Sequence, residues 1–167
     1  MSYSWASIAN GFIEMGLRNK RPVDPMKIQK LCYFANGYYL AARKGEESLI
    51  SESFQAWKFG PVLPSLYHAV KENGGGSITD YIYVYDSDLM QTIPAPPPED
   101  DRLYNRIRDK VWDYYSQKPS TQLSRITHKP GGAWERTWHE FGGAPNAQIP
   151  SEYIFEEFQP LVTPKDD

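Results

Sequence analysis

Four side chains in this sequence could carry nucleophilic or metal chemistry: Cys32, His68, His128 and His139. A cysteine beside a histidine can act as a nucleophile, and three histidines can hold a metal ion. Cys32, however, lies in the most apolar predicted helix, where a cysteine behaves as a small buried hydrophobe. No two histidines have the four-residue spacing that places both on one helix face, and glycine-rich phosphate-binding and HExxH motifs are missing. We therefore predict a protein that is not an enzyme and holds no metal and no cofactor.

The charge balance and the composition exclude several classes of protein. The 167 residues include 18 Lys+Arg and 21 Asp+Glu, and this net charge of −3 argues against a large basic field for nucleic acid. The single cysteine excludes an internal disulfide, and no apolar run approaches the length of a membrane span. The first residues lack the basic flank and apolar stretch of a signal peptide. These features predict a cytoplasmic protein with no membrane partner.

One basic patch keeps a nucleic-acid function as an alternative. The patch surrounds the start of the second predicted helix and consists of Arg18, Lys20, Arg21, Lys27 and Lys30. These side chains could contact phosphates, and the break between residues 18 and 25 could form the corner of a helix-turn-helix. On an acidic protein the same residues are more typical of a solvated rim. A DNA-binding regulator of its own operon is therefore the second hypothesis, and nucleic acid is not the expected partner.

The aromatic content exceeds what a minimal core needs. Five Trp, twelve Tyr and seven Phe make up 14% of the chain, and most of them lie on predicted helical stripes. Tyr81, Tyr83 and Tyr85 instead alternate along a β-prone segment that offers little room for all three inside. Tyrosine is favoured in binding surfaces because it buries a large area at low entropic cost and keeps a polar group. We predict that these three tyrosines, with Lys58 and His68, contact a partner protein.

The hydrophobic periodicity predicts a mainly α fold: a single compact helical domain of about six or seven helices with at most a small β-hairpin. The best-defined helix covers residues 25–44, after the N-cap Asp24. Tyr33 and Phe34 widen its apolar stripe, which indicates burial on two sides. Gly37 lies inside this helix, where it lowers helix propensity, and we expect it to allow a close crossing by another helix.

The other elements follow from turn signals and apolar spacing. Further helices are predicted over about residues 3–18, 64–72, 99–117, 120–129, 133–141 and 151–159, with a short strand over 54–59. Pro94–Pro98 predicts a polyproline-II connector without regular structure. Pro160 is predicted to end the last helix. The domain is expected to cover residues 1–162, and residues 163–167 to form a polar tail.

Three sequence blocks resemble the motifs of the SocA-like Panacea domain family. Residues 28–35 are IQKLCYFA, residues 54–67 are FQAWKFGPVLPSLY, and residues 123–128 are LSRITH, followed by Trp134. They resemble the family blocks lQKLlYfa, AWkyGPVxPxxY and LSxxTHxxxxxW in the same order and with fitting spacing. Together they span about residues 24–140, which is most of the chain. Cys32 departs mildly from the family, where an aliphatic residue is common.

The resemblance implies an antitoxin from a toxin–antitoxin operon, often associated with a prophage. It implies neutralisation of a cognate toxin by direct protein contact, because the family acts in this way on unrelated toxins. A relative delivers its toxin to a protease, so a proteolytic adaptor is a further alternative, with a cellular protease as second partner. The oligomeric state is left open.

The motif residues are also chemically suited to build a scaffold. Gly60-Pro61 and Pro64 can form a rigid corner, and Thr127-His128 can close a helix next to its free carbonyls. Trp57, Tyr67 and Trp134 are expected to join in one aromatic cluster. We therefore predict that the motif residues define the fold more than the partner site; they are Gln29, Lys30, Leu31, Trp57, Gly60, Pro61, Pro64, Tyr67, Thr127, His128 and Trp134.

Overall fold

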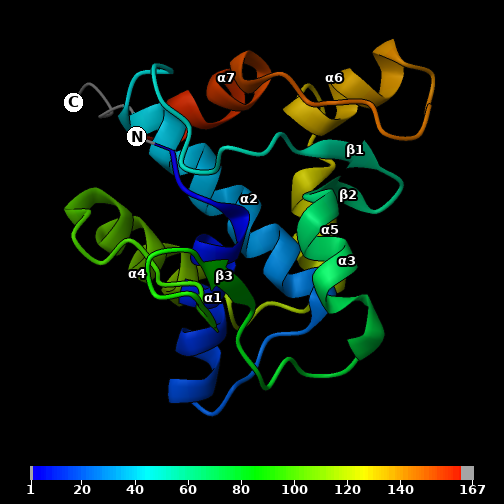
Figure 1. Ribbon diagram of the computed structural model, residues 1–167. Coiled ribbons are helices and arrows are strands. Elements are labelled where there is room, and N and C mark those ends of the chain that lie inside the picture. Colours follow the sequence, from blue (N-terminus) through cyan, green and yellow to red (C-terminus); the bar gives the residue numbers. More distant parts are fainter. Residues whose placement is uncertain (1, 163–167) are drawn as a thin grey trace.

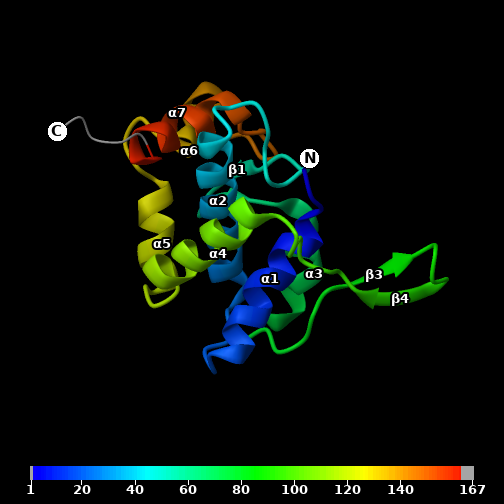
Figure 2. The ribbon, with the colours of Figure 1, turned by 90° about the vertical axis from the view of Figure 1, so that its left-hand side faces the viewer.

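The computed structural model describes residues 2–162 and is built around one central helix, α2 (Pro25–Ala42) (Figure 1). Every residue of α2 from Ile28 to Gly37 is buried, so the predicted burial on two sides is confirmed. Helices α1 (Trp5–Arg18), α4 (Arg102–Tyr115) and α7 (Ser151–Val162) pack against it (Figures 1 and 2). Such a helix is stable in water only when other elements cover it on several sides.

Polar side chains fix the starts of these helices. Asp24 accepts a hydrogen bond from the Lys27 backbone N–H at 2.8 Å, as expected of the predicted N-cap. Asp101 caps α4 in the same way, through the Tyr104 N–H at 3.0 Å. Ser120 does not act as a cap, because its hydroxyl donates to the Asp24 carboxylate at 2.9 Å instead.

The close helix crossing predicted from Gly37 is formed between α2 and α7. A Cβ at Gly37 would lie only 2.4 Å from the ring of Phe158, so no larger residue fits without a shift. Pro160 lies inside α7, and the prediction that it ends the helix is wrong. Only two residues of α7 follow it, and the carbonyl that its missing N–H leaves free can be hydrated at this exposed end. The predicted tail, residues 163–167, lies outside the described residues.

Within residues 2–162, strands are limited to two antiparallel hairpins, and the mainly α class is confirmed. The first pairs β1 (Gln55–Trp57) with β2 (Gly60–Val62). The second, one hairpin more than predicted, pairs β3 (Tyr83–Asp86) with β4 (Gln91–Pro94). Pro94 therefore belongs to a strand and not to the connector. This is possible because it is the last residue of an edge strand, which needs no N–H there. Residues 95–98 do lack helix and strand.

The remaining helices cover the outside of this arrangement. They are α3 (Pro64–Val70), the 3-10 turn η1 (Lys71–Asn73), α5 (Ser120–Thr127) and α6 (Ala133–Glu140). Two aromatic residues that the periodicity placed on apolar faces are exposed: Tyr114 at 64% and Phe141 at 53%. Both lie at the ends of peripheral helices, where the apolar stripe is wider than the area that neighbours cover. No helix within residues 2–162 combines the length and apolar character needed to cross a membrane.

Candidate functional site

The three sequence blocks meet at Gly60, the first residue of β2, directly after the turn that joins it to β1. Gly60 has a φ of +119°, a conformation that favours glycine. A Cβ on this residue would lie 2.7 Å from Thr127 Oγ1 and 2.9 Å from Lys30 Nζ. Contacts from all three blocks therefore converge on one turn that has no space for a side chain. We call this group of residues the motif cluster: Gln29, Lys30, Trp57, Gly60, Pro61, Tyr67, Thr127, His128 and Trp134.

Side-chain hydrogen bonds attach the β1–β2 hairpin to the helices. The Gln29 amide donates to the Leu63 carbonyl at 3.1 Å and accepts from the Leu63 N–H at 2.9 Å, as a neighbouring strand would. From α5, the Ser124 hydroxyl donates to the Phe59 carbonyl at 2.6 Å, and the Thr127 hydroxyl to the Ser124 carbonyl at 2.6 Å. Buried backbone groups need such partners, so these side chains are part of the fold. Leu31 lies in the core, and Pro64 is the first residue of α3.

Aromatic contacts extend the motif cluster toward α6. The Trp134 indole N–H donates to the Trp57 carbonyl at 2.6 Å. Its ring stacks on His128, with ring centroids 3.9 Å apart, and on Trp138. The Trp57 ring meets Tyr67 edge to face at 4.9 Å. Trp57, Tyr67 and Trp134 thus lie together, but Trp134 reaches Trp57 through its backbone.

Lys30 is a buried cation at the centre of the cluster. Its side chain is 1% exposed, and its ammonium donates only to the Pro61 carbonyl, at 3.3 Å, among the hydrogen bonds of residues 2–162. Burial lowers the pKa of Lys30 from 10.5 to about 7. Burial and the nearby Lys30 charge also lower the pKa of His128, whose buried Nε2 has no hydrogen-bond partner among the described residues. In both groups, burial shifts the protonation equilibrium toward the neutral form.

Cys32 and the histidines do not form a reactive group. Cys32 is fully buried, and burial raises the pKa of its thiol well above the usual value. His68 lies on the exposed face of α3, His128 ends α5, and His139 lies in the last turn of α6. Within residues 2–162, no three His, Cys, Asp or Glu side chains are grouped to hold a metal ion. Cys32 is a core residue, as its position in an apolar helix indicated.

Glu157 is a partly buried polar residue that the sequence analysis missed. This side chain of α7 accepts the Ala133 N–H at 2.9 Å and the Tyr33 hydroxyl at 3.2 Å, which joins α7 to α6 and α2. Burial raises the pKa of Glu157. Its position beside the inward-facing Phe158 is the only sequence feature that could have indicated burial.

Two of the three predicted partner-contacting tyrosines, Tyr83 and Tyr85, lie on the second hairpin, which projects from the helical body (Figure 2), and Tyr81 precedes it. Tyr83 is 51% exposed and Tyr85 66%, whereas Tyr81 is half-buried against the core. Two apolar residues at the hairpin turn, Leu89 and Met90, are also exposed and were missed by the sequence analysis. We call Tyr83, Tyr85, Leu89 and Met90 the hairpin surface.

One buried side chain anchors the base of this hairpin. Asn10 of α1 donates to the carbonyls of Ile82 at 2.8 Å and Ala95 at 2.9 Å, and it accepts the Ile82 N–H at 2.8 Å. These bonds hold both ends of the hairpin, so its direction relative to the helices is fixed.

The hairpin surface lies in an acidic stretch of the chain. The sequence has no lysine or arginine between Lys71 and Arg102. Asp80 precedes the hairpin, and Asp86 and Asp88 lie at its turn. The projecting arm therefore combines exposed aromatic and apolar side chains with negative charge.

Lys58 and His68 belong to a different surface. Both are exposed, on the β1–β2 turn and on α3, next to Phe59 and Tyr67, which are 60% and 42% exposed. Figure 1 shows the β1–β2 turn, which carries Lys58, apart from β3. Helix α3 is nearer to the tyrosines, because its residues Ala69 and Val70 line one pocket with Tyr81 and Tyr83.

The basic patch predicted around the start of α2 is not assembled. Lys30 is buried, because it lies on the side of α2 that faces β2. Lys27 donates to the Ser116 carbonyl at 2.7 Å, and Arg18 pairs with Glu14 at 2.7 Å. Lys20 and Arg21 are exposed beyond the end of α1. The few cations left give little support to phosphate binding here.

Comparison with known proteins adds a family match. Residues 28–135 match the family described as antitoxin SocA-like, Panacea domain. The chain is 31% identical over 129 residues to antitoxin SocA of Caulobacter vibrioides (strain NA1000 / CB15N), in an alignment that covers 77% of this chain and 67% of that relative. No solved structure matches.

Proposed function

Because the chain belongs to the antitoxin SocA-like, Panacea domain family, we propose that it is an antitoxin that neutralises a cognate toxin by binding it, without catalysis. The partner is a toxin protein encoded beside it, and both act in the cytoplasm. The observation that carries the binding step is the hairpin surface, where aromatic side chains are exposed on an anchored arm.

The composition of the hairpin surface suits a protein partner. Tyr83 and Tyr85 offer large, partly polar side chains of the kind that dominate binding energy at interfaces. Asp86 and Asp88 add negative charge that is not balanced by a cation on the same arm. Toxins that act on RNA or nucleotides are basic near their substrates, so an acidic arm complements them.

The shape of the hairpin suggests how binding would inactivate the toxin. A two-stranded arm that projects from the body can enter a cleft (Figure 2). Because Asn10 fixes its base, the arm loses little conformational freedom when it binds. We propose that the arm occludes the active site of the toxin. Lys58 and His68, with exposed Phe59 beside them, are proposed as a second and weaker contact.

The test is co-expression of the chain with the product of the adjacent gene. Growth is expected to recover from toxicity, and the two proteins are expected to co-purify. The double variant Tyr83→Ser/Tyr85→Ser should fold and weaken binding by about 100-fold or more, since hot-spot residues contribute about 2 kcal/mol or more each. Phe141→Ser, which alters an exposed aromatic residue directly after α6, is the matched control and should bind normally.

Two results would contradict the proposal. If the product of the adjacent gene is harmless when expressed alone, it is not a toxin. If growth recovers without complex formation, neutralisation does not occur by binding. Toxin abundance separates occlusion from the adaptor alternative: it stays constant if the toxin is blocked and falls if a protease receives it.

A further inference from the structure

An apolar groove lies between α2, α4 and the end of α7, away from the hairpin. Its volume is about 320 Å³. It is lined by Tyr38, Ala42, Leu103, Ile107, Tyr114 and Val162, among others. Tyr114 is 64% exposed, and Leu161 beside Val162 is 54% exposed. These helix faces therefore present apolar area that no other part of residues 2–162 covers.

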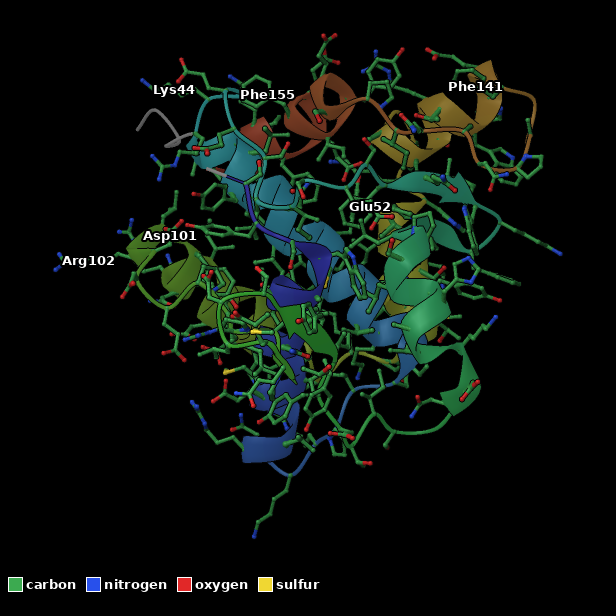
Figure 3. All side chains as sticks on the ribbon, viewed as in Figure 1. Lys44, Glu52, Asp101, Arg102, Phe141 and Phe155 are labelled. Carbon is green, nitrogen blue, oxygen red and sulfur yellow. The ribbon has the colours of Figure 1, made fainter. Side chains whose placement is uncertain are left out.

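The outer lip of this groove is basic. Arg102, Arg106, Lys110 and Tyr114 follow one another at four-residue spacing on α4, and all four are exposed. None of the three cations forms an ion pair within residues 2–162. Figure 3 shows Arg102 pointing away from the helix into solvent. Lys118 adds a fourth cation, with its ammonium 4.7 Å from the centre of the Tyr114 ring.

The groove continues at its Arg102 end into a wider polar pocket of about 720 Å³. Ala42 and Leu103 line both spaces, and Arg43, Arg102 and Arg106 line the polar one. Asp100 and Asp101 lie there too, but the Asp101 carboxylate already accepts hydrogen bonds from the hydroxyls of Tyr3 and Tyr39 at 2.9 and 2.8 Å. The continuous groove thus changes from apolar to basic along α4.

We propose that this groove binds an amphipathic helix of a partner protein, with apolar side chains on the groove floor and carboxylates against the basic lip. The lip from Arg102 to Tyr114 is about 18 Å long at 1.5 Å per residue, which matches a partner helix of about three turns. Helix-in-groove recognition needs an apolar floor that receives regularly spaced apolar side chains of the partner helix. Charge at the lip fixes the direction in which that helix lies in the groove. The site is separate from the hairpin surface, so this inference goes beyond the proposed function.

The groove fits a protein helix better than other acidic partners. A nucleic-acid backbone would use the cations of the lip but would leave the recessed apolar floor uncovered. A membrane surface would favour a protruding apolar face, whereas these apolar residues line a hollow.

The experiment uses the full chain and two labelled peptides of about 14 residues, long enough for about three helical turns. Both carry leucines at i, i+3, i+4 and i+7; one has glutamates and the other lysines along the flank. Fluorescence anisotropy should show that the glutamate peptide binds at least about tenfold more tightly, and that salt weakens its binding. Circular dichroism should show that this peptide gains helix when it binds.

Variants locate the binding. Arg106→Glu/Lys110→Glu should weaken binding of the glutamate peptide by about tenfold or more. Arg106→Ala/Lys110→Ala should weaken it less strongly, and this variant replaces the charge reversal if the reversal unfolds the chain. Lys71→Glu, a single charge reversal on an exposed residue of η1, should leave binding unchanged. Tyr83→Ser/Tyr85→Ser should also leave it unchanged, so failure here is separate from failure of the toxin proposal.

Other outcomes would overturn the inference. If the two peptides bind with equal affinity, or if the Arg106/Lys110 variants bind the glutamate peptide as tightly as the unaltered chain does, the basic lip does not contribute to binding. The chain could instead bind a single-stranded oligothymidine, or vesicles with anionic lipid, more tightly than the glutamate peptide. If the same variants abolish that binding, the lip binds nucleic acid or membrane. Concentration-dependent dimerisation that these variants abolish would assign the groove to a second copy of the chain.

Discussion

The two hairpins of this protein have the same architecture and opposite surroundings. All three residues of β2 are buried, and side chains from α2, α5 and α6 hold the β1–β2 turn. The β3–β4 hairpin is exposed along much of its length and is held at its base by Asn10. A two-stranded hairpin is only marginally stable in water, so each depends on its attachment to the helices. The difference shows that the same element can form part of the core or project into solvent.

This difference separates two uses of aromatic residues. In the motif cluster, Trp134 fills space and satisfies a backbone carbonyl. On the hairpin surface, Tyr83 and Tyr85 meet mainly solvent. Substitutions in the first region should therefore reduce stability, whereas substitutions in the second should reduce binding and leave stability nearly unchanged.

The largest effect is expected for Trp134→Ala. Loss of the buried indole should cost about 3–5 kcal/mol of unfolding free energy, because a cavity forms and the Trp57 carbonyl loses its donor. Chemical denaturation measures this loss. Phe141→Ala is the control at the end of the same helix: it should change stability by less than about 0.5 kcal/mol, because Phe141 is exposed. Similar costs for both variants would break the distinction between the two regions.

The pH dependence of stability should follow Lys30. Its pKa is about 7 in the folded chain and near 10.5 when unfolded, so the unfolded chain binds more protons between these values. Unfolding free energy should therefore rise with pH, by about 2 kcal/mol from pH 7 to pH 9, where each pKa unit is worth about 1.4 kcal/mol. Denaturation at several pH values measures the slope. Lys30→Met should flatten it and stabilise the chain near pH 7; an unchanged slope would show that Lys30 is not its source.

A smaller loss of stability is expected for Asn10→Ala. The three hydrogen bonds at the base of the second hairpin disappear, but water can reach part of this region, so the cost should be about 1 kcal/mol. Hydrogen exchange should accelerate at the amides of β3 and β4 and stay unchanged in α2. Equal acceleration in both places would mean that Asn10 supports the whole core and not the hairpin in particular.

The smallest effect on stability is expected for Tyr85→Ala. This side chain is 66% exposed, so unfolding free energy should change by less than about 0.5 kcal/mol. Affinity for the cognate toxin should nevertheless fall by about tenfold or more. Calorimetry measures the first quantity and titration with the purified toxin the second. A variant that loses stability and keeps affinity would reverse the comparison between the two hairpins.

Much of the fold could be predicted because helix periodicity and caps are local properties of the chain. Asp24, Pro25 and the apolar periodicity after them predict the start of α2 correctly and its end to within two residues. The prediction was wrong where position in the whole molecule decides. Pro160 lies so near the end of α7 that the helix tolerates it, and Pro94 lies at the end of an edge strand. Exposure of Tyr114 and Phe141 could not be predicted either, since periodicity does not show how much of a stripe neighbours cover.

For the candidate site, the sequence by itself determined the residue types: three motif blocks, alternating tyrosines and an acidic stretch around them. Only the tertiary structure decided their roles. It buries Lys30 against Gly60, although lysine is usually exposed, because Gly60 leaves no side chain in its way. It also brings Asn10 to Ile82 and aligns the cations of α4 along an apolar groove between three helices. Such contacts join residues far apart in the chain, so they depend on packing that local sequence patterns do not encode.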